Sequence, residues 1–370
     1  MLTLSRRAAL RGAMAVGCAL TASHFAQAAE PQTIGEGPID EGLFVDINGQ
    51  PQWITVRGRD RRNPVLLWLH GGPGIAMSGQ APLFFDWERD FTVVQWDQPG
   101  GGSTLARNGL DNTGPLTIAR FAADAIAVAE WTRTHLGARK IVVMGVSWGT
   151  ILGLHIASRR PDLVAAYVGT GQFVSGPRGE KLGYDLALQA ARTRGDTAAV
   201  AELEKAGPPP YVRFEDFIVR QKYVNPPGEP PGPEEKAAIA EAGKLLAAPP
   251  PADARWVARD LPQVDGVKAF LATQQAAFRE TNAFEAESLG LAFKVPMFFF
   301  QGENDWNTPT PLVREYVGKL EAPHKDLVIL PGADHLAVVF HGQLLKLLDA
   351  HVRPLVLASA PGASTDRRPS

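Results

Sequence analysis

Ser147 is the residue of this chain with the clearest potential for chemistry. It is the centre of Gly145-Val146-Ser147-Trp148-Gly149, a G-x-S-x-G pattern that directly follows the apolar run 140–144 and precedes a helical pattern. A strand, a sharp turn and a helix in this order form a nucleophile elbow, which lifts the serine hydroxyl out of the backbone. Because a serine hydroxyl is a weak nucleophile by itself, it needs a neighbouring base. The pattern therefore predicts a catalytic Ser147.

Asp305 and His335 are the candidate partners of Ser147. Each lies in a loop just after a run of strand character, 295–300 for the acid and 326–330 for the histidine. An imidazole takes the proton of the attacking serine, and a carboxylate holds the imidazole tautomer and stabilises its charge. The order nucleophile, acid, base is that of the α/β-hydrolases and differs from the two common serine protease orders. Together the three residues predict a Ser-His-Asp acyl-enzyme mechanism acting on an ester or amide.

Two backbone N–H groups are candidates for an oxyanion hole. Gly72 lies in His70-Gly71-Gly72-Pro73-Gly74, a loop directly after the apolar run 65–69, and its N–H can point at a substrate carbonyl oxygen. The N–H of Trp148, the residue after the nucleophile, is the second donor. A glycine-rich loop can also be only a tight turn, and we expect His70 to hold this loop rather than act as a base.

These motifs resemble those of the proline iminopeptidase family, a branch of the α/β-hydrolases related to prolyl aminopeptidases. The matching motifs follow in order and approximate spacing between about residues 40 and 350: the His70–Gly74 loop, Asp97-Gln98, the elbow, Gly302 with Asp305 and Thr308-Pro309, and Asp334-His335. The resemblance implies an α/β-hydrolase fold with a helical cap, and a reaction without metal or cofactor.

Three departures from the family pattern leave the substrate open. Pro99 stands where family members usually have Arg, and Asp334 stands where they usually have Gly. The predicted cap also contains no Trp-x-x-Trp-Glu pattern of the kind found in prolyl aminopeptidases, whose acidic cap residues hold the substrate amino group. The resemblance therefore implies hydrolysis without specifying the substrate.

Glu215 and Asp216 are the candidate substrate-binding acids, because a buried ammonium group needs a carboxylate beside it. Phe214 and Phe217 flank these acids, and together with Ile218 they have the spacing of the buried face of a helix. The alternative is therefore that Glu215 and Asp216 form only the polar face of a short helix.

The leading hypothesis is a serine hydrolase that acts on esters or amides, including those of N-terminal residues of short peptides. A general esterase or amidase of the same fold is the alternative, and a non-catalytic binding protein of this fold is a third hypothesis. Epoxide hydrolases and dehalogenases use a carboxylate nucleophile at the elbow, so Ser147 excludes them.

Strands and helices alternate along the chain and must position these residues. Two strand-like runs join at Asn48-Gly49, a strong hairpin signal, and continuous apolar runs predict strands buried on both faces of a parallel sheet. The predicted strands are 42–47, 52–56, 65–69, 91–96, 140–146, 163–168, 295–300 and 326–330, and the predicted helices are 117–135, 148–159, 184–194, 256–279, 311–320 and 338–352. This alternation predicts an α/β fold, with a mostly parallel sheet and helices on both faces.

The chain divides into a two-part core with an insertion. The segment 171–291 has helical patterns and proline clusters but no convincing buried strand, which predicts an inserted helical cap; the alternative is a disordered linker, which its aromatic content disfavours. The α/β-hydrolase core then comprises 29–170 and 292–355, followed by a disordered tail, 356–370.

The first 28 residues have the features of a twin-arginine export signal. Arg6 and Arg7 precede a weakly apolar run, 13–22, and Ala26-Gln27-Ala28 forms a small-x-small cleavage site. The run is far shorter than the ~20 residues of a membrane span, so we expect an exported, periplasmic protein without one. Cys18 is the only cysteine and lies in this signal, so the mature chain would form no disulfide.

The composition is that of an ordinary globular protein. Charged residues make up 21% and hydrophobic residues 45% of the chain, with a formal net charge of −2 and no dense block of Lys and Arg. Nucleic acid and anionic membrane surfaces are therefore not expected as partners. A small molecule or a short peptide is the expected substrate, and the oligomeric state is left open.

Overall fold

The computed structural model of the chain describes residues 36–224, 233–247, 264–335 and 340–358. The predicted export signal, 1–28, lies outside these ranges, as do most of the predicted tail and the proline clusters at 226–231 and 249–251. No helix in the described ranges combines the length and the apolar character that crossing a membrane requires.

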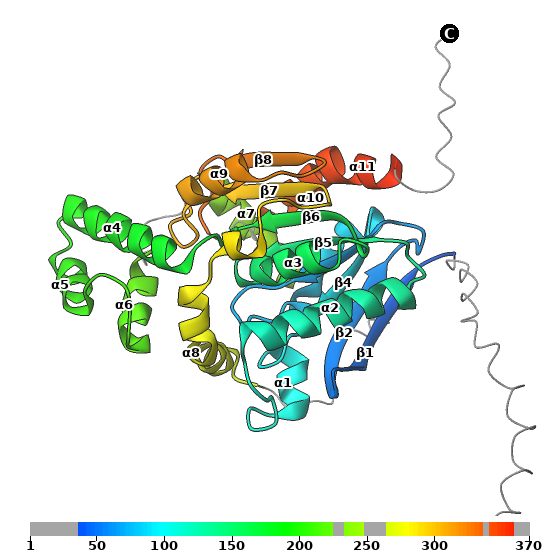
Figure 1. The fold of residues 1–370 in the computed structure, drawn as a ribbon, viewed down its shortest axis with the longest axis horizontal. Helices are drawn as coiled ribbons and strands as arrows, with labels where there is room; N and C mark the ends of the chain where they lie inside the picture. Colours follow the sequence, from blue (N-terminus) through cyan, green and yellow to red (C-terminus); the bar gives the residue numbers. More distant parts are fainter. Residues whose placement is uncertain (1–35, 225–232, 248–263, 336–339, 359–370) are drawn as a thin grey trace, which may run out of the picture. The chain divides into compact units, whose positions relative to one another are not determined.

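An eight-stranded sheet runs through the described chain in the order β1-β2-β4-β3-β5-β6-β7-β8 (Figure 1). The antiparallel neighbours are β1–β2 and β2–β4, and the remaining neighbours are parallel, which confirms the predicted mostly parallel sheet. The strands are β1 (Ile39–Ile47), β2 (Gln50–Gly58), β3 (Val65–Leu69), β4 (Thr92–Trp96), β5 (Ile141–Val146), β6 (Val164–Thr170), β7 (Met297–Gly302) and β8 (Lys325–Leu330).

The hairpin between β1 and β2 turns at the predicted dipeptide. Asn48 has φ 52° and Gly49 has φ 84°, so both central residues lie in the left-handed region that a type I′ turn requires. The side chain of Asp46 accepts a hydrogen bond from the N–H of Gly49 at 3.0 Å. This local chemistry sets the register in which Ile47 faces Gln50.

The central strands send alternate side chains into two hydrophobic cores. On β3, Leu67 and Leu69 belong to one core, while Leu66 and Trp68 belong to the other. Residues on one strand point alternately to the two faces of a sheet, so a strand buried on both faces is apolar throughout. The continuous apolar runs in the sequence are therefore explained by helices on both faces.

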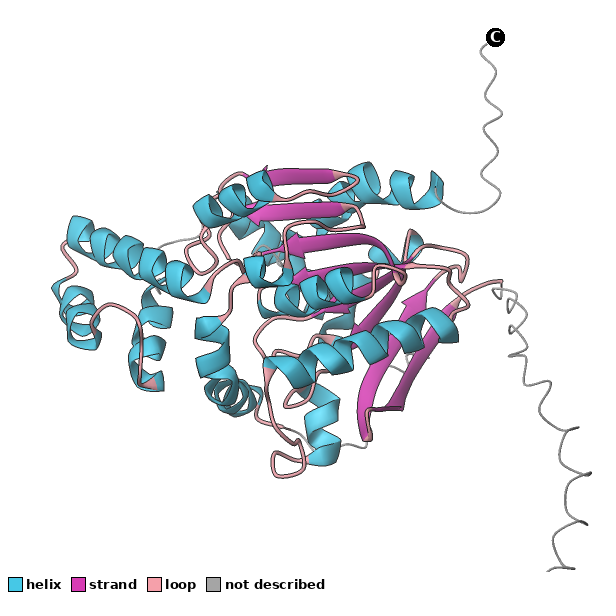
Figure 2. Ribbon diagram, viewed as in Figure 1, coloured by secondary structure: helices cyan, strands magenta, loops and turns pink. Residues whose placement is uncertain are grey.

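Helices cover both faces of the sheet (Figure 2). The first core includes side chains of α2 (Ile118–His135), α3 (Trp148–Arg159) and α9 (Thr310–Lys319). The second core includes side chains of the 3₁₀ helices η1 (Ser78–Phe84) and η2 (Trp87–Arg89), of α7 (Pro233–Ala247) and of α10 (His341–Leu347). Helix α10 continues through a π-helical turn (Leu348–Val352) into α11 (Arg353–Ala358). A short helix, α1 (Gly102–Asn108), forms where the sequence indicates only a glycine-rich turn.

The predicted cap segment is helical in its described residues, but it divides into two parts. Helices α4 (Gly176–Arg194), α5 (Thr197–Ala206) and α6 (Phe214–Val224) share a small core of their own, and α8 (Gly266–Ala283) packs on α4 (Figure 1). Helix α7 instead packs on η1 of the core. The last described part of the segment is the 3₁₀ helix η3 (Ala286–Leu289).

Helix α4 begins earlier than its apolar pattern indicates. Ser175 is its N-cap, and the Ser175 hydroxyl accepts a hydrogen bond from the N–H of Arg178 at 3.2 Å. Pro177 lies in the first turn, where the missing N–H of proline costs nothing. The first turns of α4 therefore extend from the end of β6 towards the site.

Candidate active site

Ser147 lies on a strained turn between β5 and α3. Its backbone has φ 52° and ψ −118°, a conformation that non-glycine residues rarely adopt. The surrounding structure holds the turn, since the N–H of Ser147 donates to the carbonyl of Thr170 at 2.9 Å. Strain of this kind is typical of functional positions that the rest of the fold over-determines.

The two glycines of the G-x-S-x-G pattern allow β3, β5 and α3 to approach closely. A Cβ atom at Gly149 would lie 2.1 Å from the carbonyl oxygen of Leu69, and one at Gly145 would lie 2.5 Å from the carbonyl oxygen of Gly149. Any side chain at either position would force the elbow apart. The spacing of the pattern is therefore a packing requirement of the turn.

The structure brings Ser147, Asp305 and His335 together, although they lie far apart in the sequence. The Nε2 atom of His335 is 3.0 Å from the Oγ of Ser147, and its Nδ1 atom is 2.9 Å from Oδ2 and 3.1 Å from Oδ1 of Asp305. A carboxylate accepts hydrogen bonds, so Nδ1 carries the proton and Nε2 is free to accept the proton of the serine. This is the arrangement that nucleophilic activation of a serine requires.

The loop after β7 fixes the orientation of Asp305, which is fully buried. Its Oδ1 accepts the N–H groups of Asn307 at 3.0 Å and Thr308 at 2.8 Å, and its Oδ2 accepts the hydroxyl of Thr308 at 2.7 Å. Gln301 of β7 donates to the same oxygen, Oδ2, at 3.0 Å. These donors aim the carboxylate at the ring of His335.

Burial and charge compete at His335. Burial lowers the pKa of this imidazole, but the charge of Asp305 and the hydrogen bond to it outweigh burial, so the pKa is raised above its ordinary value. Asp334 acts in the same direction as Asp305, whereas the positive charge of Arg220 lowers the pKa. The positively charged form of this imidazole is therefore stabilised by Asp305.

The candidate oxyanion donors lie beside the nucleophile. Gly72, Ser147 and Trp148 line one pocket of about 40 Å³. Trp148 is the first residue of α3, and helix geometry leaves its N–H without an acceptor inside the helix. Gly72 has φ 118°, which favours glycine, and a Cβ atom there would lie 2.7 Å from the backbone nitrogen of Gly74.

A buried network connects the two segments that carry these donors. The side-chain oxygen of Gln98 accepts the indole N–H of Trp148 at 3.1 Å, and the Gln98 amide nitrogen donates to the carbonyl of His70 at 3.1 Å. The backbone N–H of Gln98 donates to Nε2 of His70 at 3.2 Å, so Nδ1 carries the proton and donates to the carbonyl of Gly71 at 2.8 Å. Burial lowers the pKa of His70 to about 4, so this imidazole is neutral and holds the loop, as the sequence indicates.

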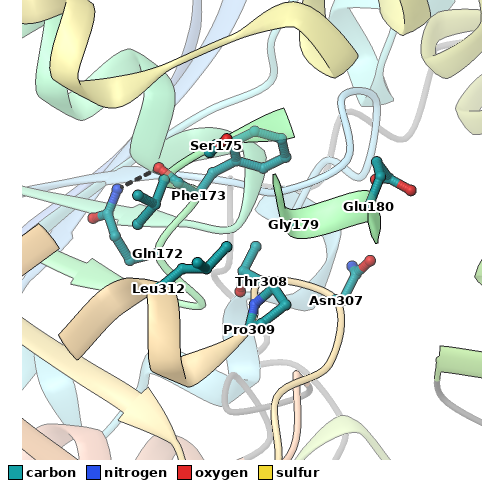
Figure 3. A pocket seen from close by; sticks show the side chains of 10 residues that line it. Gln172, Phe173, Ser175, Gly179, Glu180, Asn307, Thr308, Pro309 and Leu312 are labelled. Atoms are coloured by element: carbon teal, nitrogen blue, oxygen red, sulfur yellow. Dashed lines mark hydrogen bonds between the residues drawn. The ribbon is translucent and has the colours of Figure 1, made fainter. Parts of the chain in front are cut away.

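Glu180 is a site residue that the motifs do not reveal. It lies on α4, and its carboxyl group lines the pocket that contains Ser147. Figure 3 shows the adjoining pocket, whose lining also includes Glu180 together with Phe173, Asn307 and Thr308. Its position soon after β6 could have indicated a site residue, since ligands of α/β sheets bind beyond the carboxyl ends of the strands.

The carboxylate of Glu180 is buried and only partly satisfied. Burial raises the pKa of Glu180, and the charge of Arg220 opposes this shift. The Nε atom of Arg220 lies 3.2 Å from Oε2 of Glu180, but this Oε2 accepts no hydrogen bond from the described residues. A buried carboxylate with unused acceptor capacity favours a ligand that donates hydrogen bonds.

Glu215 and Asp216 do not lie where the sequence-based hypothesis requires. The side chain of Glu215 is 66% exposed, and Arg213 lies 3.5 Å from Glu215 and 3.9 Å from Asp216. Neither acid lines the pocket that contains Ser147, whereas Phe217 of the same helix does. Phe217 therefore faces the pocket, Glu215 faces solvent, and Asp216 is half-buried beside Arg213.

In the described ranges, no group of three or more His, Cys, Asp or Glu side chains is arranged to hold a metal ion. The ionisable groups of the site instead form pairs, Asp305 with His335 and Glu180 with Arg220.

Comparisons with known proteins support the fold. Residues 64–221 match the family model described as alpha/beta hydrolase fold. A probable aminopeptidase of Bacillus subtilis is 27% identical over 283 residues, covering 76% of this chain and 86% of that protein. A probable proline iminopeptidase of Streptomyces coelicolor is 34% identical over 134 residues, covering 36% of this chain and 40% of that protein.

Solved structures agree with this assignment of the fold. A proline iminopeptidase from Mycobacterium smegmatis matches with a TM-score of 0.55 and 20% identity, covering 86% of this chain and 100% of that chain. A proline iminopeptidase-related protein from Thermus thermophilus matches with a TM-score of 0.54 and 19% identity, covering 86% of this chain and 99% of that chain. The chain is therefore an enzyme of the α/β hydrolase fold that resembles the proline iminopeptidases, as its motifs predict.

Proposed function

We propose that this enzyme is a serine hydrolase in which Ser147 is the nucleophile, His335 the general base and Asp305 the acid that orients it. One observation carries the proposal: a single imidazole lies within hydrogen-bond reach of both the Ser147 hydroxyl, at 3.0 Å, and the Asp305 carboxylate, at 2.9 Å. An imidazole held between a hydroxyl and a carboxylate transfers protons in both halves of an acyl-transfer reaction.

The reaction proceeds in two halves. Ser147 Oγ attacks the substrate carbonyl carbon while its proton passes to Nε2 of His335, and the N–H groups of Gly72 and Trp148 stabilise the negative oxygen that forms. The leaving amine or alcohol departs with the proton from Nε2, which leaves an acyl-enzyme. Water then gives a proton to Nε2 and attacks the acyl carbon, and the proton returns to Ser147 Oγ as the acid product is released.

The substrate class that fits this pocket best is an aminoacyl ester or amide with a free amino group. The Glu180 carboxylate lines the same pocket as Ser147 and has unused acceptor capacity, so it can receive the N–H groups of an ammonium. Phe173 and Phe217 provide an apolar side of the pocket that suits a hydrocarbon side chain. Glu180 thus takes the role that the sequence assigns to Glu215 and Asp216.

A general esterase or amidase is the second candidate, and one observation favours it. Arg220 lies 3.2 Å from Glu180, so the positive charge of Arg220 already neutralises much of the negative charge that would attract an ammonium group. Under this alternative Glu180 serves only as the partner of Arg220, and neutral substrates are hydrolysed as well as those with a free amine.

Replacing the nucleophile tests the mechanism. Ser147→Ala removes a hydroxyl from the end of a turn without opening a core cavity, so the fold should persist while turnover falls by about four or more orders of magnitude. The measurement is hydrolysis of an aryl ester alongside a thermal unfolding curve. Residual turnover above about a tenth of the wild-type rate would exclude Ser147 as the nucleophile.

Replacing Glu180 separates the two substrate classes. Glu180→Gln keeps the shape of the side chain but removes its charge, so we expect KM for an aminoacyl anilide with a free amine to rise at least about tenfold. Hydrolysis of the N-acetylated anilide and of a neutral aryl ester should change little. Glu215→Gln is the matched control, because it removes a cap carboxylate that is exposed to solvent.

Equal effects of Glu180→Gln on charged and neutral substrates would support the general esterase or amidase. The same conclusion would follow if the wild type hydrolysed the neutral ester but not the substrate with a free amine.

A further inference from the structure

Arg220 is a fully buried arginine that connects the cap to the loop carrying Asp305. It lies on α6, and its Nη1 donates to the side-chain oxygen of Asn307 at 2.9 Å. Its Nη2 donates to the carbonyl oxygens of Trp306 at 3.3 Å and Gly179 at 3.4 Å. One guanidinium therefore joins α6 and α4 to the segment that follows β7.

A glycine in α4 provides the space for this guanidinium. A Cβ atom at Gly183 would lie 2.0 Å from Nη2 of Arg220 and 2.6 Å from the carbonyl oxygen of Trp306. Glycine inside a helix costs about 0.5 to 1 kcal/mol relative to alanine. The helix tolerates this cost at a position where any side chain would displace Arg220.

The contacts of Arg220 lead directly to the acid of the triad. The side-chain oxygen of Asn307 accepts the hydrogen bond from Nη1, and the backbone N–H of Asn307 donates to Oδ1 of Asp305 at 3.0 Å. The next residue, Thr308, holds the same carboxylate through its N–H and its hydroxyl. A shift of this loop would therefore turn the carboxylate away from Nδ1 of His335.

We propose that Arg220 is a positioning residue, whose buried guanidinium fixes the loop 305–308 and so aims Asp305 at His335. The proposal rests on the proposed function, since it assigns Asp305 to the triad. The proposal goes beyond that function because the alignment of the triad then depends on the packing of helix α6 against the loop 305–308. Loss of alignment of about 1 Å at a catalytic group costs up to about 100-fold in rate.

Arg220 also acts on His335 through its charge. Burial lowers the pKa of His335, Asp305 and Asp334 raise it, and the positive charge of Arg220 lowers it. Glu180 faces Arg220 on its other side and partly compensates this charge. Removing this charge should therefore place the pH at half-maximal activity above that of a variant that loosens the same loop but keeps the charge, a difference that a purely structural contact would not produce.

The test compares Arg220→Gln and Arg220→Lys with a control, all assayed with a neutral aryl ester so that Glu180 is not needed for binding. Arg220→Gln should lower kcat at least about tenfold with little change in KM, and its pH midpoint should lie above that of Arg220→Lys. Arg220→Lys keeps the charge but not the planar fork, so kcat should fall and its midpoint should not rise above that of the wild type. The control is Arg178→Gln, which breaks the exposed pair between Arg178 of α4 and Glu315 of α9 and should change neither quantity.

A milder variant keeps the test valid if Arg220→Gln does not fold. Asn307→Ala removes the acceptor of Nη1 but leaves the charge of Arg220 and its pair with Glu180 in place, so kcat should fall and the pH midpoint should not rise above that of the wild type. Wild-type kcat in both Asn307→Ala and Arg220→Lys, or Arg220 variants that behave like Arg178→Gln, would overturn the proposal. If the Arg220 proposal is overturned while Ser147→Ala is inactive in the same assays, only the role of Arg220 is wrong. If Ser147→Ala is active, the proposed function itself is wrong.

Discussion

At the scale of single residues, His335 links the geometry of the site to its pH dependence. In the proposed mechanism its imidazole must be neutral at Nε2 to accept the proton of Ser147, so we expect activity to require a pH above the pKa of His335. Burial alone would lower that pKa, but the charge of Asp305 and the hydrogen bond to it raise it. The acid therefore shifts the active range to higher pH while it stabilises the charged imidazole that forms during the reaction.

We accordingly expect kcat/KM of the free enzyme to rise with pH through a midpoint above 6.5, the ordinary pKa of histidine. Asp305→Asn removes the negative charge that raises the pKa of His335, so the pH midpoint should move downwards. The rate should fall by about 10⁴-fold. The measurement is the pH profile of aryl ester hydrolysis for both proteins. A midpoint that is the same in both would show that Asp305 does not act on the group that titrates.

At the scale of elements, the loop between β4 and α1 contains a carboxylate to which the described residues offer hydroxyl and N–H donors but no cationic partner. Asp97 is fully buried, and its Oδ2 accepts hydrogen bonds from the hydroxyl of Ser78 and the N–H of Ser103, both at 2.8 Å. Desolvation outweighs these bonds and raises the pKa of Asp97 to about 6. Between pH 3.8, the ordinary pKa of an aspartate, and about pH 6, the folded state therefore keeps a proton on Asp97 that the unfolded chain has lost.

The stability contributed by protonated Asp97 is fully present below pH 4 and is lost as the pH rises to about 6. Asp97→Asn keeps an acceptor for Ser103 and removes the buried charge. Relative to wild type, the free energy of unfolding of the variant should therefore rise between pH 4 and 7, ending about 1 to 3 kcal/mol above wild type. Urea unfolding at pH 4 and pH 7 gives both differences. An equal difference at the two pH values would show that Asp97 is not the titrating group.

The elements that surround the site were predictable from sequence where local rules are strong. The hairpin at Asn48-Gly49, the buried strands and helix α3 match their predictions closely because backbone conformation or burial on both faces dictates the residue types. Helix α1 and the first turns of α4 were missed, since they depend on tertiary contacts and on a cap formed by Ser175. The packing of α7 on η1 is a long-range contact that no local pattern specifies.

The residues of the site also divide into those that local sequence rules predict and those that depend on tertiary contacts. Ser147, Asp305 and His335 were predictable because chain order and strand ends place such residues at one edge of a parallel sheet. Glu180 and Arg220 were not, because they lie on different helices that only the tertiary structure brings together, at 3.2 Å between Arg220 Nε and Glu180 Oε2. Glu215 and Asp216 were plausible from their charge, but Glu215 faces solvent, Asp216 is half-buried beside Arg213, and neither lines the pocket that contains Ser147.

At the scale of the whole molecule, the predicted export signal remains a proposal that the described residues do not test. We propose that twin-arginine transport reads Arg6 and Arg7, so replacing both by lysine should leave unprocessed precursor in the cytoplasm. Cell fractionation and the mass of the product give the answer. Normal processing and recovery from the periplasm would exclude this route.

The central claim is that Ser147 is a nucleophile activated by His335, and covalent labelling tests it most directly. A fluorophosphonate reacts with an activated serine hydroxyl and leaves other serines unmodified. We predict one label per chain, located by peptide mass spectrometry on Ser147, with labelling abolished in Ser147→Ala and strongly slowed in His335→Ala. His351→Ala, which removes an imidazole that pairs with Asp326 away from the site, should label at the wild-type rate. Stoichiometric labelling of another residue, or undiminished labelling of His335→Ala, would contradict the account.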